Sequence, residues 1–332
     1  MMGKQYFRNM VNTASCLVLA TFLCGFAPEK GGFIDYLGQK PPGKDAELFA
    51  PHLMRSSFNV HSAPTFSSDG SVVVWAIMDS KYRTSLVEMR KVNGSWSSPV
   101  MPSFVDSAVD YVYPSFSVDG KTLFFSSRRK MPAGYPTNNG NRIWQVERTR
   151  DGWGNPVPFD TTVSRGQDYA NSITSDGTIY FSSALGGGAN WNIRKAVKVK
   201  GRYTEPVLLP YSINGVGYED GPYIAPDESF LIFESQRPGG ASDNTSLYIS
   251  FQSANGRWSL PVSMGAKINS GKGERFARLS PDGKYLFFGS YRNQSPERRG
   301  ADMYWIDATV IDELKKIPRP KRPLSSLLVM KL

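Results

Sequence analysis

The sequence predicts an all-β fold, a five-bladed β-propeller in which an N-terminal strand completes the last blade. First, the 332-residue chain has 13% aromatic residues, 31 Gly and 23 Pro, a composition typical of short strands joined by turns. Second, a strand–turn–strand unit centred on an aspartate recurs along the chain. Third, the segment that precedes the first unit resembles the one strand that the last unit lacks.

The repeated unit is a β-hairpin. Each copy has an alternating apolar strand, a turn that contains Asp, and a second strand of aromatic and β-branched residues. The turn aspartates lie 50 to 57 residues apart, at Asp69, Asp119, Asp176, Asp227 and Asp282. A third strand follows in each copy, and four copies then carry an aromatic residue and Pro-Val before a fourth strand. Four antiparallel strands recurring at this period describe a propeller blade.

The two ends of the repeat region predict how the ring closes. The fifth copy stops after its third strand, near Ile311, and residues 46–53 (AELFAPHL) resemble the fourth strands of the other copies. We expect this segment to complete blade five, which leaves no exposed sheet edge. A sixth blade is less favoured because residues 31–58 are too few to form one.

Two copies carry a recognisable repeat. FSVDGKTLFFSS (Phe116–Ser127) and LSPDGKYLFFGS (Leu279–Ser290) resemble the WD40-like β-propeller repeat of exported bacterial envelope proteins, the type found in the TolB propeller. YLGQKPPG (Tyr36–Gly43) is similar to the N-terminus of exported members with a lone propeller. The resemblance covers residues 46–311 and implies the fold and an envelope location. It implies no activity, because propellers include binders, scaffolds and enzymes.

The first residues have the pattern of an export signal. Lys4 and Arg8 precede a 13-residue apolar stretch, Ala14–Phe26, which is too short to span a bilayer. We expect a signal peptide over 1–27, an N-terminal extension over 28–45, the propeller over 46–311 and a basic tail over 312–332. The expected mature protein is periplasmic or extracellular and has no transmembrane segment. Both cysteines, Cys16 and Cys24, lie in the leader, and a lipid anchor at Cys24 is the less favoured alternative.

The net charge of +10 is concentrated at the two ends of the chain. Removing the 2 charges of the leader and the 6 that follow Leu314 leaves +2 on the central body. Because so small a charge does not favour phosphate binding, we expect no nucleic-acid partner. The sequence has no Walker loop, no dinucleotide fingerprint and no G-x-S-x-G elbow, so we expect no cofactor. A metal ion held by Glu219, Glu274 and His61 is disfavoured because their blades spread around the ring.

The candidate site lies where the innermost strands begin, on the face that also carries the loops between second and third strands. Counting eight residues back from each turn aspartate gives His61, Tyr111, Asp168, Glu219 and Glu274, and the next residues include Asp220 and Arg275. The loops add Trp191 and three arginines at matching places, Arg128, Arg237 and Arg292. We expect these side chains to ring the central funnel. Asp168, Glu219 and Glu274 recur from blade to blade, as do the three arginines, and such recurrence favours a structural role. Those that break the repeat, His61, Tyr111, Asp220 and Arg275, are the better candidates for binding a ligand.

Two hypotheses for function follow. The leading one is a non-catalytic exported propeller that binds a protein partner or an envelope glycan through its funnel face. The alternative is a glycan-active hydrolase or lyase that uses Glu219 and Glu274 as acid and base. The alternative requires carboxylates about 5 to 10 Å apart across an open cleft.

Overall fold

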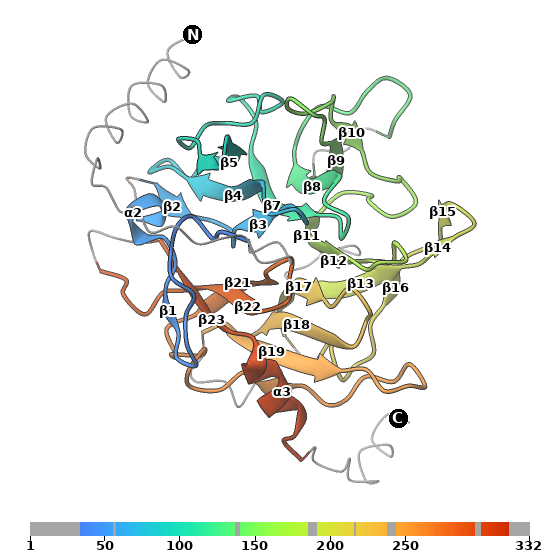
Figure 1. The fold of residues 1–332 in the computed structure, drawn as a ribbon. Helices are drawn as coiled ribbons and strands as arrows, with labels where there is room; N and C mark the ends of the chain where they lie inside the picture. The colour runs from blue at the N-terminus through green and yellow to red at the C-terminus, as the bar shows by residue number, and fades with distance from the viewer. Residues whose placement is uncertain are drawn as a thin grey trace.

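The computed structural model describes residues 34–55, 58–136, 140–184, 191–215, 217–237, 244–295 and 300–318. The expected leader with Cys16 and Cys24, and the tail from residue 319 onward, lie outside the described residues. Five antiparallel sheets are arranged around one axis, with their first strands at the centre (Figure 1). The predicted five-bladed β-propeller is confirmed.

The blades follow one another in chain order. Blade one contains β2 (Asn59–Val60), β3 (Thr65–Phe66), β4 (Val72–Met78), β5 (Thr84–Val92) and β6 (Ser95–Trp96). Blade two contains β7 (Tyr111–Phe116), β8 (Thr122–Ser127), β9 (Arg142–Glu147) and β10 (Val157–Pro158). Blade three contains β11 (Asp168–Ile173), β12 (Ile179–Ser183), β13 (Asn192–Ala196) and β16 (Val207–Leu208), with the small hairpin β14 (Lys198–Val199) and β15 (Arg202–Tyr203). Blade four contains β17 (Glu219–Ile224), β18 (Phe230–Ser235), β19 (Ser246–Phe251) and β20 (Val262–Ser263).

Blade five joins the two ends of the propeller. It contains β21 (Glu274–Leu279), β22 (Tyr285–Ser290) and β23 (Asp302–Asp307), and its fourth strand is β1 (Glu47–Leu48). β1 pairs antiparallel with β23, and Glu47 lies opposite Trp305. The predicted closure by an N-terminal strand is confirmed. Since β1 covers the outer edge of β23, the last blade leaves no unpaired edge there.

The turn between the first two strands of each blade is built from the aspartate. In blade one, Oδ1 of Asp69 accepts hydrogen bonds from the Ser67 hydroxyl at 2.6 Å and the Ser71 amide at 3.1 Å. The next residue has positive φ, which favours glycine. Blade four has Glu228 there, with φ 60°, and its carboxylate accepts a hydrogen bond from the Tyr180 hydroxyl at 2.7 Å. This hydrogen bond to blade three explains why blade four has a glutamate at the position where the other turns have glycine.

Two short helices complete the described chain. α2 (Pro51–Met54) follows β1, and α3 (Thr309–Lys315) follows β23. Ile311 and Leu314 of α3 pack into the apolar core that blades four and five share. The helix therefore continues past residue 311, the expected end of the propeller, as part of the packed structure. The described residues contain no helix of the length and hydrophobicity that crossing a membrane requires.

Candidate functional site

A repeated irregularity shapes the centre of the ring. In blades two to five, the first strand shifts its pairing register with the second strand two or three residues after it begins. These first strands are β7, β11, β17 and β21. At this point Tyr113, Gly221 and Phe276 have φ of 54°, 58° and 62°. In blade four, a Cβ atom at Gly221 would lie 2.3 Å from Oε1 of Glu234, so a larger residue there would displace this carboxylate. The bulges bring Tyr113, Gly221 and Phe276 to the central cavity.

An aromatic row runs across the funnel. The rings of His61 and Phe276 lie 5.7 Å apart, those of His61 and Tyr113 5.9 Å, and those of Tyr113 and Tyr169 6.2 Å, all between centroids. Trp191 extends the row, 4.9 Å from Tyr169. These residues come from blades five, one, two and three, so ring contacts link four blades.

Beside the aromatic row lies a charged cluster. Nε of Arg275 is 2.7 Å from Oε2 of Glu234, and its terminal nitrogen is 3.3 Å from Oδ2 of Asp220. The same nitrogen donates to the Tyr218 hydroxyl at 2.8 Å, and that hydroxyl donates to Asp220. Burial raises the pKa of Glu234, and the neighbouring Arg275 opposes this effect. Two carboxylates thus share one guanidinium between blades four and five.

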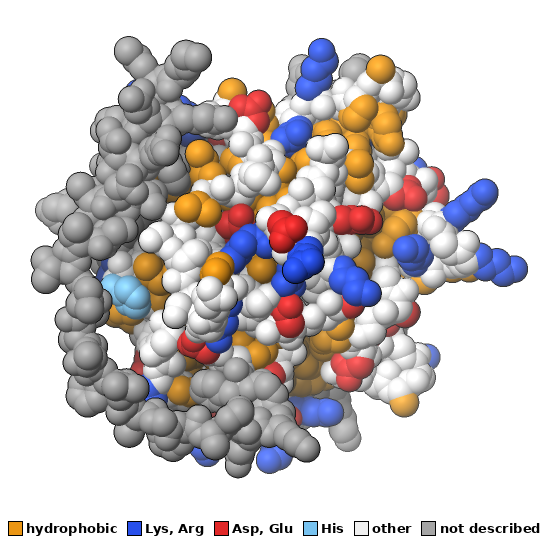
Figure 2. Space-filling model, turned by 45° about the horizontal axis from the view of Figure 1, so that its top comes forward, with side chains coloured by type: hydrophobic (Ala, Val, Ile, Leu, Met, Phe, Trp, Pro, Cys, Tyr) orange, Lys and Arg blue, Asp and Glu red, His pale blue; other side chains and the backbone are white. Residues whose placement is uncertain are grey.

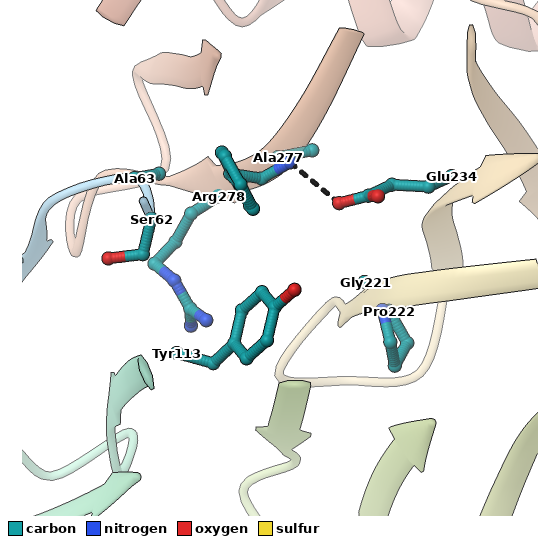
Figure 3. A pocket seen from close by; sticks show the side chains of 9 residues that line it. Ser62, Ala63, Tyr113, Gly221, Pro222, Glu234, Ala277 and Arg278 are labelled. Carbon is teal, nitrogen blue, oxygen red and sulfur yellow. Dashed lines mark hydrogen bonds between the residues drawn. The ribbon is translucent and has the colours of Figure 1, made fainter. Parts of the chain in front are cut away.

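The propeller axis is closed below this cluster. Arg278 extends across the axis between Ser62 and Tyr113 (Figure 3) and donates to the Ser115 hydroxyl of blade two at 2.8 Å. The remaining cavity measures about 20 Å³, which is room for about one water molecule. Among the described residues, side chains therefore fill the axis and leave no room there for a ligand larger than water.

His61 occupies an apolar part of the funnel wall. Burial, with Arg275 nearby, lowers the pKa of His61 to about 4. The imidazole is therefore neutral at pH 7.

The three recurring acids lie inside the blades. Asp168, Glu219 and Glu274 have no exposed surface. Glu219 accepts from the Ser235 hydroxyl at 3.1 Å and pairs with Arg237 at 3.4 Å. Glu274 accepts from the hydroxyl groups of Ser270 and Ser290.

Asp168 holds the chain that leads into β11. Its carboxylate accepts from the backbone amides of Arg165 and Gly166 at 2.8 and 2.9 Å and from the Ser183 hydroxyl at 2.8 Å. Burial raises the pKa of Asp168, and these hydrogen bonds oppose that effect. Like Glu219 and Glu274, it anchors an inner strand and does not reach the funnel cavity.

Tyr111 also departs from its expected position in the funnel. Its side chain is fully buried between blades one and two, where it contacts Phe104 and Phe125. Because side chains alternate along a strand, the first residue of the inner strand points into the blades, and the next, such as Asp220 or Arg275, points to the axis.

The arginine expected at Arg128 is one residue later in the structure. Arg129, Arg237 and Arg292 each donate their backbone amide to the serine that ends the second strand. Arg128 is exposed. The two adjacent arginines in this copy left the alignment ambiguous by one residue.

These matching arginines hold the loops that enter the inner strands. Arg129 donates to the carbonyl oxygen of Phe104, Arg237 to that of Ile213, and Arg292 to that of Ile268. Each also lies over an aromatic ring of its own blade, such as Tyr304 at 4.4 Å from Arg292. These contacts stabilise the blades, so the three arginines have a structural role.

Several funnel residues escaped sequence reasoning, namely Tyr113, Tyr218, Glu234, Phe276 and Arg278. Gly221 was the available signal, since a glycine inside an apolar strand indicates a bulge, and Tyr113 and Phe276 occupy the same place in other copies. Glu234 could have been noticed as an acid within the apolar second strand FLIFES.

The described residues bring together no group of three metal-ligating side chains. On the face drawn in Figure 2, acidic and basic side chains are interspersed, and neither sign forms a large patch. This distribution fits the small net charge of the central body.

The similarity of this chain to known proteins concerns the fold alone. No family model matches the sequence, and no curated protein matches it. TolB from Acinetobacter baumannii is among the similar solved structures, with 16% identity, 75% of this chain and 54% of that chain covered, and a TM-score of 0.42. A family-43 endo-arabinanase from Bacillus licheniformis has 14% identity, 75% and 94% coverage, and a TM-score of 0.44. A family-62 α-L-arabinofuranosidase catalytic domain from Coprinopsis cinerea has 10% identity, 74% and 90% coverage, and a TM-score of 0.46.

Proposed function

We propose that this chain is a non-catalytic, exported propeller that binds a segment of a partner protein through its funnel face. The observation that carries the proposal is the row of half-buried rings, His61, Tyr113, Tyr169 and Trp191, beside Arg275. Aromatic residues and arginine are enriched where protein interfaces gain most of their binding energy. Export is supported by the leader pattern of the first residues.

The small size of the axial cavity supports docking on its surroundings over enclosure of a small molecule on the axis. The cavity on the axis is about 20 Å³, whereas pockets that enclose small ligands measure about 300 to 1,000 Å³. A partner's side chains can instead lie on the aromatic row, with Arg275 and Asp220 at one end.

The hydrolase alternative loses support from the positions of its proposed acid and base. Glu219 and Glu274 are fully buried and hydrogen-bonded within their blades. A glycosidase needs both carboxylates at the bond to be broken, with space for a sugar between them.

Site-specific crosslinking tests the proposal. A photoreactive amino acid replaces Trp191 in the funnel or, as the control, Val92, which is exposed on the opposite face. The expected result is one discrete adduct from position 191 and none from position 92. The adduct partner is then purified, and its affinity for Tyr169→Ala should fall by about tenfold or more.

Two results would refute the proposal. One is binding of the purified partner that is unchanged in both Tyr169→Ala and Trp191→Ala. The other is hydrolysis of a chromogenic glycoside by the wild-type protein that is lost in Glu219→Gln or Glu274→Gln while the melting temperature stays the same. The second result would establish the enzyme instead.

A further inference from the structure

An open groove lies between blades two and three, on the face of the Asp-Gly turns and away from the funnel. It measures about 670 Å³, far more than the axial cavity. Its inner wall carries the side chains of Phe124, Phe159 and Ile173, and Tyr203 lies at one side. Polar groups in the lining come from Gln145, Asp160, Asp119 and Lys198.

The equivalent space between blades one and two is closed by side chains. Trp153 stacks on Phe116 with centroids 6.0 Å apart, and its Nε1 donates to Oε2 of Glu88 at 2.9 Å. Arg90 pairs with the same carboxylate and lies over the Trp153 ring.

Blades two and three have different residues at each of these positions. Gln145 takes the register position of Glu88, since Gln145 lies opposite Phe124 as Glu88 lies opposite Val74. Tyr203 takes the place of Trp153. It contacts Phe159 at 5.0 Å and donates to the carbonyl oxygen of Gly177 at 2.9 Å. In the described part of the chain, Tyr203 makes no hydrogen bond to Gln145, so blades two and three lack a counterpart of the Trp153–Glu88 hydrogen bond.

An ion pair is missing as well. Arg148 of blade two reaches back to Asp69, the turn aspartate of blade one, with N–O distances of 3.1 and 3.0 Å. The residue of blade three that follows β13, as Arg148 follows β9, is Val197. Within the described chain, neither Asp119 nor Lys198 forms an ion pair, and both line the groove. Oδ1 of Asp119 accepts hydrogen bonds within its own turn, and the Lys198 ammonium lies over the Tyr203 ring at 5.7 Å. The second oxygen of Asp119 and the hydrogen atoms of the Lys198 ammonium can still meet a ligand in the groove.

The groups that line the groove match one chemical class of ligand. A sugar ring has an apolar C–H face, which packs on an aromatic ring such as that of the partly exposed Tyr203. It also has hydroxyl groups that both donate and accept hydrogen bonds. The amide of Gln145, the carboxylates of Asp119 and Asp160, and the ammonium of Lys198 can serve these hydroxyl groups. Two carboxylates against one cation disfavour an anionic ligand.

We propose that the groove between blades two and three is a binding site for a short neutral oligosaccharide, separate from the funnel. Its volume lies within the range of about 300 to 1,000 Å³ that is usual for ligand sites.

Calorimetric titration of the full chain with maltotriose, xylotriose and chitotriose tests this site. At least one trisaccharide should bind with a dissociation constant of about 1 mM or lower. Lys198→Ala and Tyr203→Ala should each weaken binding by about tenfold. The double variant Gln145→Glu with Tyr203→Trp introduces the counterparts of Glu88 and Trp153, which fill the space between blades one and two, so it should abolish binding.

Two matched controls locate the binding. Lys200→Ala changes an exposed lysine two residues along the same hairpin and outside the groove, so binding should persist. Trp191→Ala alters the funnel and should also leave saccharide binding unchanged. The proposal is overturned if none of the three sugars binds, or if binding survives the double variant. Loss of binding in Trp191→Ala alone would move the sugar site to the funnel.

Discussion

The hydroxyl group of Tyr36 donates a hydrogen bond of 2.8 Å to Oδ1 of Asp282, a residue 246 positions later in the chain. Asp282 is the turn aspartate of blade five, and the Tyr36 ring packs against Trp305 of the same blade and Phe66 of blade one. The N-terminal extension therefore joins the first and last blades, in addition to the strand β1 that follows it. The ring is closed at two places.

Tyr36 should contribute measurably to stability. Tyr36→Phe removes one hydrogen bond and should cost about 1 kcal/mol, whereas Tyr36→Ala also removes a buried ring and should cost about 3 to 5 kcal/mol. Chemical denaturation measures both. Tyr82→Ala is the control, because Tyr82 is 69% exposed and should change stability by less than about 0.5 kcal/mol. Equal effects of Tyr36→Ala and Tyr82→Ala would contradict the second closure.

Deletion of residues 46–53 should open the ring. The outer edge of β23 would lose β1, and Phe49, which packs on Phe287 and Trp305, would be lost with it. An unpaired edge promotes association, so we expect aggregation or a much lower melting temperature in size-exclusion and thermal measurements. Truncation after residue 318 keeps β1 and β23 paired and serves as the control. A monomeric deletion variant with an unchanged melting temperature would refute the closure argument.

Substitutions of the adjacent residues Arg129 and Arg128 should have very different effects on the free energy of unfolding. Arg129 donates to the carbonyl oxygen of Phe104 and lies over Trp144, so Arg129→Ala should cost about 2 kcal/mol. Arg128 is exposed, and Arg128→Ala should stay within about 0.5 kcal/mol. Unfolding free energies of the two variants test the assignment. The reverse order would show that Arg128 holds the loop.

Glu219 should matter for folding rather than for chemistry. Glu219→Ala leaves the half-buried Arg237 without its carboxylate and should cost about 3 to 5 kcal/mol. Glu205 forms an exposed ion pair with Arg165, and Glu205→Ala should cost less than about 1 kcal/mol. Comparable stabilities for the two variants would argue that Glu219 is not a structural anchor.

His61 should make stability depend on pH in the acidic range. Its pKa falls from 6.5 to about 4 on folding, so the unfolded chain binds a proton more readily between these values. Its contribution to stability is complete above pH 6.5 and is lost as the pH falls toward 4. His61→Gln should therefore flatten the decline by at most about 1.4 kcal/mol per pH unit, measured by denaturation from pH 4 to 8. His52→Gln, an exposed control, should follow the wild-type curve. Parallel curves for the wild type and His61→Gln would mean that His61 is not buried in solution.

The residues alone predicted the number of blades, the Asp turns and the closing strand. The number of blades and the Asp turns follow from a local pattern that the chain repeats, such as the turn at Asp119 or Asp282. The closing strand follows because blade five lacks a fourth strand and the segment AELFAPHL can supply it. The short-range physics of hairpins and the requirement to cover the edge of β23 were sufficient for these features.

The inward or outward direction of the inner strands was decided only in three dimensions. Bulges at Tyr113, Gly221 and Phe276 shift the pairing register, and a single step of register moves a side chain from the axis into the blades. Before the bulge, side chains alternate along the strand, so Tyr111, the first residue of β7, is buried, whereas Arg275, the second residue of β21, reaches the funnel. The closed axis, where Arg278 meets Ser115, depends on residues 163 positions apart. The groove beside Tyr203 likewise depends on which side chains of two neighbouring blades meet, and no periodicity in the chain records such a contact.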